Sequence, residues 1–150
     1  MSSWLSHFVN PDDLDPGDHI YVYRGMLFST CHGIYIGSHA NESAVIHFIP
    51  DHSYKEAKGR VYISSLTEFR LGFISNLVTV RKYRYGVPQW ELLAKRRGSC
   101  SMRKSGSNEK VIQRAWDCYN GRIPTVGFNT SEDFALFCKL GHTYRDSSYQ

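Results

Sequence analysis

Short stretches that alternate apolar and polar residues fill the first half of the chain. Residues 19–24, with the sequence HIYVYR, follow a Pro-Gly turn, and residues 32–37 and 44–50 form two further β-rich runs. A period of two residues indicates half-buried strands. The polar stretch between the second and third runs is long enough for a hairpin loop. The pattern predicts three antiparallel strands in meander order, and residues 61–64 predict a further strand.

Helical spacing prevails in the second half. Residues 107–121 repeat apolar side chains every three or four positions, as an amphipathic helix does. Residues 65–72 carry a Ser-x-x-Glu capping signature before a glycine, and residues 88–98 begin with proline and end on basic residues and glycine, so both predict short helices. We expect residues 76–86 to form a strand and residues 122–129 an extended lead. One face of the helix predicted over residues 88–98 groups Trp90, Leu93 and Ala94.

The composition fits one α+β domain. With 150 residues, of which 41% are hydrophobic and 14% aromatic, the chain has apolar mass for one core but not the length for two ordinary domains. We predict a domain over residues 14–141, in which an antiparallel sheet packs against helices. A lead-in over residues 1–13 precedes it, and a polar tail over residues 142–150 follows it.

Targeting signals and cysteine usage predict a soluble, cytoplasmic protein. No stretch approaches the roughly 18 consecutive apolar residues of a membrane span. The first residues lack the basic and apolar regions of a secretory signal. The four cysteines include no CxxC pair, so we expect reduced thiols.

Basic residues concentrate between positions 81 and 122, although the net charge of the chain is only +4. This region holds eleven Lys or Arg residues against three acidic ones. A basic face attracts anionic lipid headgroups or an acidic protein partner, and the alternative is an ordinary solvated surface. We predict peripheral contact with an anionic membrane through residues 81–122. Nucleic acid is not an expected partner, because no helix-turn-helix, zinc-finger or RNA-binding signature is present.

The stretch FNTSEDFALFCKLG, residues 128–141, predicts a helix that begins at a candidate site. Thr130 and Asp133 have the spacing of a capping pair, which puts Ser131 at the first helical position. The first turn of a helix has unpaired N–H groups and partial positive charge. These favour a nucleophile and can receive a developing oxyanion.

Two histidines upstream are the candidate bases. His32 begins the second predicted strand, and His47 lies within the third. Adjacent antiparallel strands can bring both onto one face, and we expect both imidazoles to point at Ser131 within hydrogen-bonding reach. A metal site is not predicted, because Cys31 and His32 are consecutive strand residues that point to opposite faces. No cofactor is predicted.

Four motifs occur in a characteristic order: LDPGDHIYVYR, HGIYIG, VIHF and NTSEDFALFCKLG, with LAKRRGSCS before the penultimate helix. In this order and spacing they resemble the lecithin retinol acyltransferase-like domain, in particular its plant branch. The resemblance covers residues 14–141. It implies a circularly permuted papain-like α+β fold and thiol-based acyl transfer or phospholipid hydrolysis through an acyl-enzyme.

The resemblance also implies roles for single residues. His32 matches the imidazole that activates the family's nucleophile, and His47 matches the histidine that orients it. Ser131 matches the nucleophilic cysteine, while Cys31 stands where plant relatives commonly have a second histidine. A serine hydroxyl is a far weaker acid than a thiol and must lose its proton during attack. We therefore expect residual activity several orders of magnitude below that of a cysteine enzyme.

Three functions remain open at this point. The first is a catalytically degenerate or very weak domain that binds an acyl lipid or a protein. The second is an acyltransferase or phospholipase A-type hydrolase that forms an acyl-enzyme at residue 131, or a cysteine enzyme that carries a Cys→Ser replacement there. The third is an interaction protein that works through its basic face, in which case charge reversal at Lys95, Arg96 and Arg97 abolishes binding.

Overall fold

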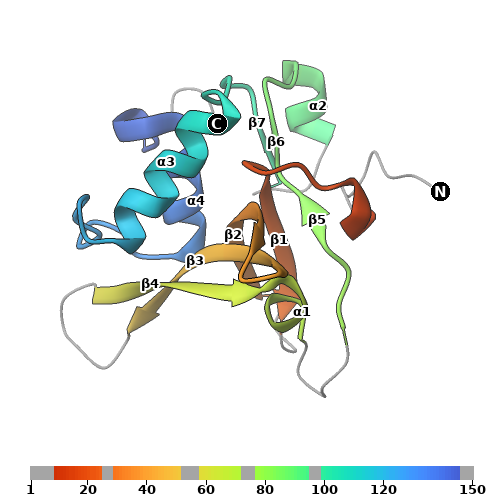
Figure 1. Ribbon diagram of the computed structural model, residues 1–150. Coiled ribbons are helices and arrows are strands. Elements are labelled where there is room, and N and C mark those ends of the chain that lie inside the picture. The colour runs from red at the N-terminus through yellow and green to blue at the C-terminus, as the bar shows by residue number, and fades with distance from the viewer. Residues whose placement is uncertain (1–8, 25–28, 52–57, 72–76, 95–98, 146–150) are drawn as a thin grey trace.

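A five-stranded antiparallel sheet forms the centre of the computed structural model, which describes residues 9–24, 29–51, 58–71, 77–94 and 99–145 (Figure 1). The strand order is β4-β3-β2-β1-β5. Strands β1 to β3 form the predicted three-stranded meander, β4 is the further predicted strand and extends it, and the class is the predicted α+β. The strands are β1 His19–Arg24, β2 Ser29–His39, β3 Glu42–Asp51, β4 Lys58–Ser65 and β5 Arg81–Lys82.

A two-residue turn closes the hairpin between β2 and β3. Ala40 and Asn41 have φ angles of 51° and 65°. Two consecutive residues in the left-handed region are typical of a type I′ turn, whose twist matches that of the flanking strands. The polar stretch around the turn was predicted as a loop, but its outer residues continue the two strands.

A β-bulge in β2 interrupts the pairing near this turn. From the turn, the pairing runs as far as Gly37↔Ala44, and it resumes at Tyr35↔Val45. Ile36 is therefore an extra residue in β2. Gly37 adopts a φ angle of 80°, a conformation that glycine reaches at little cost and that suits a bulge.

The bulge determines which side chains share a face with His47. An unbroken ladder from the turn would place His47 opposite Ile34. The extra residue places it opposite Gly33 instead, and a shift of one residue exchanges the two faces of a strand. His47 therefore lies on the same face as Gly33 and Cys31, and His32 lies on the other face.

Each face of the sheet has its own helical cover. Helices α3, Asn108–Tyr119, and α4, Ser131–Leu140, pack on one side, which we call the helix face. The short helix α1, Leu66–Phe69, packs on the other side, which we call the α1 face. Buried residues at the helix face include Ile34, Ile46, Phe48, Phe134 and Phe137, and those at the α1 face include Val22, Val45, Leu66, Phe69 and Val80.

Side-chain caps begin two of the predicted helices. Ser65 Oγ accepts the N–H of Glu68 at 3.0 Å before α1, and Ser107 Oγ accepts the N–H of Lys110 at 3.3 Å before α3. Both helices begin where the sequence predicted. At each start, the serine hydroxyl at the N-cap accepts one of the free N–H groups of the first turn. A 3-10 turn, η1 over Pro11–Asp13, precedes β1.

The strand predicted over residues 76–86 is divided between two sheets. β5 pairs with β1, whereas β6, Arg84–Tyr85, pairs in parallel with β7, Cys100–Ser101. Tyr83 stands at the break, and its N–H donates to the His19 carbonyl at 2.8 Å. Residues 122–129, predicted as extended, form a turn-rich connection without a strand.

Helix α2, Gln89–Ala94, presents apolar side chains to solvent. Trp90 is 67% exposed and Leu93 is 78% exposed. Glu91 is buried, and its carboxylate lies 3.6 Å from the guanidinium of Arg84. The face on which the sequence grouped Trp90 and Leu93 is thus an exposed apolar face.

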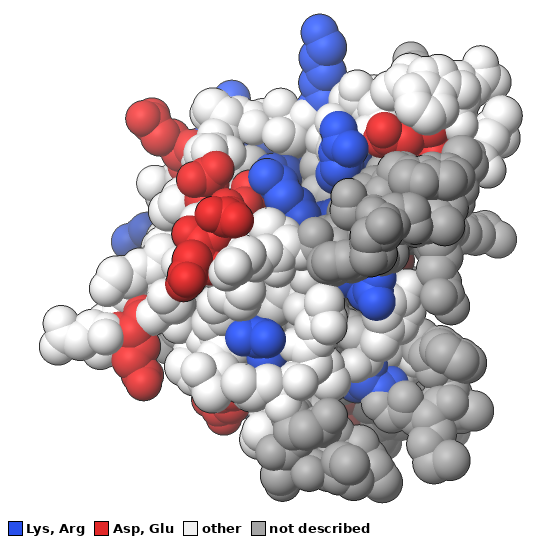
Figure 2. All heavy atoms as spheres, turned by 90° about the vertical axis from the view of Figure 1, so that its right-hand side faces the viewer, with Lys and Arg blue, Asp and Glu red and all other residues white. Residues whose placement is uncertain are grey.

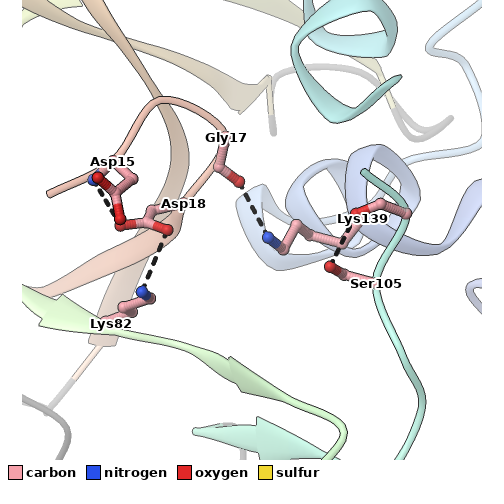
Figure 3. Close-up of polar contacts among 7 residues, drawn as sticks. Asp15, Gly17, Asp18, Lys82, Ser105 and Lys139 are labelled. Carbon is pink, nitrogen blue, oxygen red and sulfur yellow. Dashed lines mark hydrogen bonds and ion pairs between the residues drawn. The ribbon is translucent and has the colours of Figure 1, made fainter. Parts of the chain in front are cut away.

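A buried lysine ties the C-terminal end of α4 to the start of the sheet (Figure 3). The ammonium of Lys139 donates to the Gly17 carbonyl at 3.0 Å, and the Gly17 N–H donates to the Tyr35 carbonyl at 2.7 Å. Beside this turn, Lys82 lies 3.2 Å from the Asp18 carboxylate. These contacts hold α4 against β1 and β2.

Residues outside the predicted limits 14–141 also pack against the domain. After α4, the 3-10 turn η2, Gly141–Thr143, leads to Tyr144, which is buried against Phe128 and Phe137. At the other end, the N–H of Val9 donates to the Val80 carbonyl at 3.1 Å. Among the described residues, no helix has the length and apolar character that crossing a bilayer requires.

Replacing Gly37 with alanine tests the bulge, and Gly121 provides a matched control. Both glycines have φ angles near 80°, so alanine costs about 1–2 kcal/mol of backbone strain at either position. A Cβ at Gly37 would also lie 3.1 Å from the Pro16 ring, whereas a Cβ at Gly121 meets nothing within 4 Å. We expect urea unfolding to show a larger loss of stability for Gly37→Ala than for Gly121→Ala. Equal losses would contradict a packed bulge.

Candidate functional site

Ser131 occupies the first position of α4, where a capping box begins the helix. Thr130 Oγ1 accepts the N–H of Asp133 at 3.0 Å, and Asp133 Oδ2 accepts the N–H of Thr130 at 3.2 Å. The predicted capping pair is therefore confirmed. Ser131 is only 9% exposed, and its hydroxyl lies where the first-turn N–H groups carry partial positive charge.

The Ser131 hydroxyl joins the helix to the sheet. The pairing between β2 and β3 ends at Gly33↔His47, so the ladder offers the N–H of His32 no partner on β3. This N–H donates instead to Ser131 Oγ at 2.9 Å. Helix α4 therefore begins where the β2–β3 ladder stops.

The imidazole of His32 belongs to a buried polar network on the helix face. Its Nδ1 lies 2.7 Å from Nε2 of His19, and its Nε2 lies 3.1 Å from Oγ1 of Thr30. Nδ1 of His19 in turn lies 2.8 Å from the hydroxyl of Tyr85. Both ring nitrogens of His32 are therefore engaged by partners other than Ser131.

The imidazole of His47 lies on the α1 face. Its Nε2 is 2.8 Å from the hydroxyl of Ser64, and its ring meets the edge of Phe69 with centroids 5.4 Å apart. Nδ1 is buried and has no hydrogen-bond partner. Buried polar atoms in native proteins are nearly always paired, so this nitrogen marks unmet hydrogen-bonding capacity.

The expectation that both imidazoles point at Ser131 from one face is wrong. His32 and His47 lie on neighbouring strands, as predicted, but the bulge at Ile36 places their side chains on opposite faces of the sheet. His32 contacts Ser131 only through its backbone N–H. The catalytic roles that the resemblance implies for His32, His47 and Ser131 stay predictions.

Cys31 is the β2 side chain that meets Ser131. Its thiol shares a side-chain hydrogen bond with the Ser131 hydroxyl. Arg24, on β1, lies close enough to act electrostatically on both Cys31 and His47, and its guanidinium donates to the Phe69 carbonyl. The site on the α1 face thus contains a thiol, an imidazole and a guanidinium beside the Ser131 hydroxyl.

Burial controls the titration of this site and of the His32 network. Burial lowers the pKa of His32 to about 3, and burial together with the positive charge of Arg24 lowers the pKa of His47 to about 4. Burial raises the pKa of the Cys31 thiol, while Arg24 and the hydrogen bond with Ser131 oppose the rise. Both imidazoles are therefore neutral at neutral pH, and the Cys31 thiol is protonated.

Within the described part of the chain, the hydrogen-bond partners of the Ser131 hydroxyl include neither an imidazole nor a carboxylate. A serine nucleophile needs a partner that takes its proton during attack. The side-chain partner of Ser131 is the protonated Cys31 thiol, and its oxygen already accepts the N–H of His32. In the described part of the chain, no three His, Cys, Asp or Glu side chains gather closely enough to hold a metal ion.

From the sequence, Cys31 was considered as a rejected metal ligand and as a departure from the family pattern, but not as the partner of Ser131, and Arg24 and Ser64 were missed. A usable signal existed, because strand alternation already placed Cys31 and His32 on opposite faces. Only the strand register decides whether the side chain of Cys31 or that of His32 points toward Ser131. The register depends on the bulge. Arg24 and Ser64 carried no distinctive motif.

Comparisons with known proteins agree with the motif order. A model of the lecithin retinol acyltransferase family matches residues 12–144. The protein LEAD-SENSITIVE 1 of the plant Arabidopsis thaliana is 28% identical over 170 aligned residues, which cover 90% of this chain. The chain spans 61% of the length of that relative. No solved structure gives a significant match.

The buried imidazoles predict that stability falls in mild acid. Because the folded-state pKa values of His32 and His47 lie below the ordinary value of 6.5, the unfolded chain binds more protons below that pH. Their contribution to stability is complete above about pH 6.5 and is lost as the pH falls toward 4 and 3, by up to about 1.4 kcal/mol per pH unit for each histidine. Urea unfolding between pH 7.5 and pH 5 measures this slope.

His32→Gln should flatten the slope, because it removes one depressed imidazole. His39→Gln is the matched control for the substitution itself, since His39 is an exposed histidine on the same strand. A free energy of unfolding that stays constant across this range in the wild-type protein would contradict neutral buried imidazoles.

Proposed function

The chain belongs to the lecithin retinol acyltransferase family, and we propose that it is a catalytically degenerate member that binds an acyl lipid or a protein partner without acyl transfer at residue 131. We interpret the chain order, with the strands first and the Ser131 helix last, as the circularly permuted papain-like arrangement. The observation that carries the proposal is the environment of Ser131. Its hydroxyl contacts a backbone N–H and a thiol, and neither accepts its proton at neutral pH.

We expect this environment to lower the rate of acyl transfer at Ser131 greatly. General-base assistance contributes typically 10²–10⁴-fold to a rate, and a serine without it lacks the thiolate route that a cysteine has. His32, the candidate base named from the resemblance, has both ring nitrogens engaged on the helix face. The features that remain, a helix N-terminus and a largely buried cluster of polar side chains, support binding of an ester group rather than its cleavage.

A base placed next to residue 131 should restore acyl transfer to that residue. Position 31 is the place for this base, because its side chain meets residue 131. The test uses three proteins: Cys31→Ala, Cys31→Ala with Ser131→Cys, and Cys31→His with Ser131→Cys. Each is incubated with dioctanoyl phosphatidylcholine, and acyl adducts are located by intact mass and peptide mapping. We expect no adduct at Ser131 in the first protein and slow reaction of the introduced thiol in the second. In the third, the imidazole at position 31 should make that thiol react about 100-fold faster or more.

Adding His32→Ala to the third protein is the control, and it should preserve most of the gain because that imidazole points to the helix face. An acyl adduct at Ser131 in the Cys31→Ala protein would instead favour the alternative function, an acyltransferase or phospholipase A-type hydrolase. Loss of the gain on removal of His32 would contradict the separation of the two faces.

A second proposal concerns peripheral contact with an anionic membrane. It rests on the exposed apolar face of α2, since a tryptophan beside basic residues is typical of segments that lie at a membrane interface. Trp90 and Leu93 are both mostly exposed, and the basic residues Lys95, Arg96 and Arg97 follow them in sequence but lie outside the described residues. In this proposal the protein is cytoplasmic and docks reversibly.

The charge distribution favours a local contact over a broad basic face. On the face drawn in Figure 2, Lys and Arg side chains are scattered among neutral and acidic residues. Several basic residues between positions 81 and 122 are tied into the fold: Lys82 to Asp18, Arg84 to Glu91, Arg114 to the Cys138 carbonyl and Arg122 to Asp117. The α2 segment combines charge with exposed apolar side chains, so it is the better anchor.

Trp90→Ala with Leu93→Ala tests this contact. Insertion of two large apolar side chains contributes at least 1–2 kcal/mol by rough area estimates, so the double variant should bind about tenfold more weakly to phosphatidylserine-containing vesicles. Val126→Ala is the control, since Val126 is 67% exposed elsewhere. Co-sedimentation at low and high salt measures binding. Equal binding by the double variant and the control would exclude α2 as the anchor.

A further inference from the structure

Cys31 differs from the other three cysteines in its exposure and its neighbours. Cys100, Cys118 and Cys138 are buried, and burial raises the pKa of Cys118 to about 12. Cys31 is only partly buried and lies near the start of α4. It is therefore the thiol that an electrophile can reach in the folded protein.

The two strands that flank Cys31 place nitrogen groups near it on one face. On β1, Val22 pairs with Cys31, so Arg24 stands one diagonal position away; on β3, His47 pairs with Gly33 and stands one diagonal position away on the other side. Diagonal neighbours on one face lie about 7–8 Å apart at Cα, within reach of long side chains.

Two of these nitrogens have no hydrogen-bond partner although both are buried. They are Nδ1 of His47 and Nε of Arg24. His47 is only 5% exposed, so bulk water has little access to its ring. Leaving a buried donor or acceptor unpaired costs about 1–3 kcal/mol. A ligand that brings an acceptor to Arg24 and a proton donor to His47 would recover this cost.

Phe69 forms the floor of the same cluster. Its ring meets His47 at 5.4 Å and lies 5.7 Å from the guanidinium carbon of Arg24, and its carbonyl accepts a hydrogen bond from that guanidinium. Two residues further along, Leu71 is 43% exposed and bridges to Leu77, which is 50% exposed. These two leucines are exposed apolar side chains that follow Phe69 closely along the chain, and an acyl chain could use them.

We propose that Cys31 is an acyl-accepting thiol that takes a fatty acyl group from an activated acyl ester or thioester. Sγ of Cys31 attacks the carbonyl carbon of the donor, and the thiol proton passes to Nδ1 of His47. The guanidinium of Arg24 donates to the oxyanion that develops on the carbonyl oxygen. The bond to the leaving group then breaks, His47 returns the proton to that group, and a thioester remains on Cys31.

This inference rests on the proposed function in one respect, because an acyl chain must occupy the site. It differs in placing the covalent acceptor on β2 instead of on α4. Nucleophile and base then come from neighbouring strands of the α1 face, while the Ser131 hydroxyl supports the thiol through their shared hydrogen bond.

Labelling with p-nitrophenyl octanoate tests the proposal. Intact mass and peptide mapping should find one octanoyl group on Cys31 of the wild-type protein, and neutral hydroxylamine should remove it, as expected of a thioester. Ser131→Ala should still place the adduct on Cys31, but more slowly because the thiol loses its hydrogen bond with the hydroxyl, and Cys31→Ala should lose the adduct. Cys118→Ala is the matched control and should label like the wild type.

The rate of octanoylation distinguishes a thiol that His47 assists from a thiol that is merely accessible. His47→Gln should slow octanoylation of Cys31 about 100-fold, because it removes the proton acceptor. Ser64→Ala, which keeps the imidazole but removes its hydroxyl partner, should slow it less and provides a second variant if His47→Gln does not fold. Unchanged rates in both variants, an adduct on another residue, or no adduct in the folded wild-type protein would each overturn the proposal.

Binding to dioctanoyl phosphatidylcholine, measured on the same proteins, separates this proposal from the proposed function. Lipid binding without octanoylation would overturn the acceptor role of Cys31 but would still support the proposed lipid-binding function. Octanoylation of Cys31 without lipid binding would overturn the lipid-binding form of the proposed function and support the acceptor role.

Discussion

One extra residue in β2 determines how the side chains of the site are oriented. The type I′ turn at Ala40 and Asn41 fixes one register, and the bulge at Ile36 changes it by one position before the strands reach His47. Both faces of the sheet are buried, so a register error would bring polar side chains into one core and apolar side chains out of the other. The two apolar clusters therefore hold the bulge in place, and the bulge decides what Ser131 meets.

As a consequence, the two histidines lie in different surroundings. On the helix face, His32 forms a neutral chain with His19, Thr30 and Tyr85, in which every imidazole nitrogen has a partner. Such a network rigidifies a core when it is fully paired. On the α1 face, His47 keeps one nitrogen unpaired. Complete pairing suits a structural role, and an open nitrogen suits a ligand.

The elements were largely predictable from the sequence, whereas the site was predictable only in part. Alternation and caps identified the three-stranded meander, a further strand at β4 and the starts of α1, α3 and α4, because those signals are local. The break at Tyr83 and the exposure of Trp90 were missed, since both depend on tertiary contacts. Ser131 was placed correctly by its capping pair, but the orientation of His32 was not, because Gly37 is compatible with a bulge yet does not specify the cross-strand register.

The position of Ser131 also explains how the fold tolerates a hydroxyl there. The N–H of His32 is buried where the β2–β3 ladder ends, and it requires an acceptor. A serine oxygen is a stronger acceptor than a cysteine sulfur, so the substitution satisfies this backbone donor at least as well as a thiol would. Stability and nucleophilicity therefore make different demands on residue 131. A serine meets the first demand; in the proposed function it does not meet the second, and the proposed chemistry of the site passes to the Cys31 thiol, which shares a hydrogen bond with Ser131.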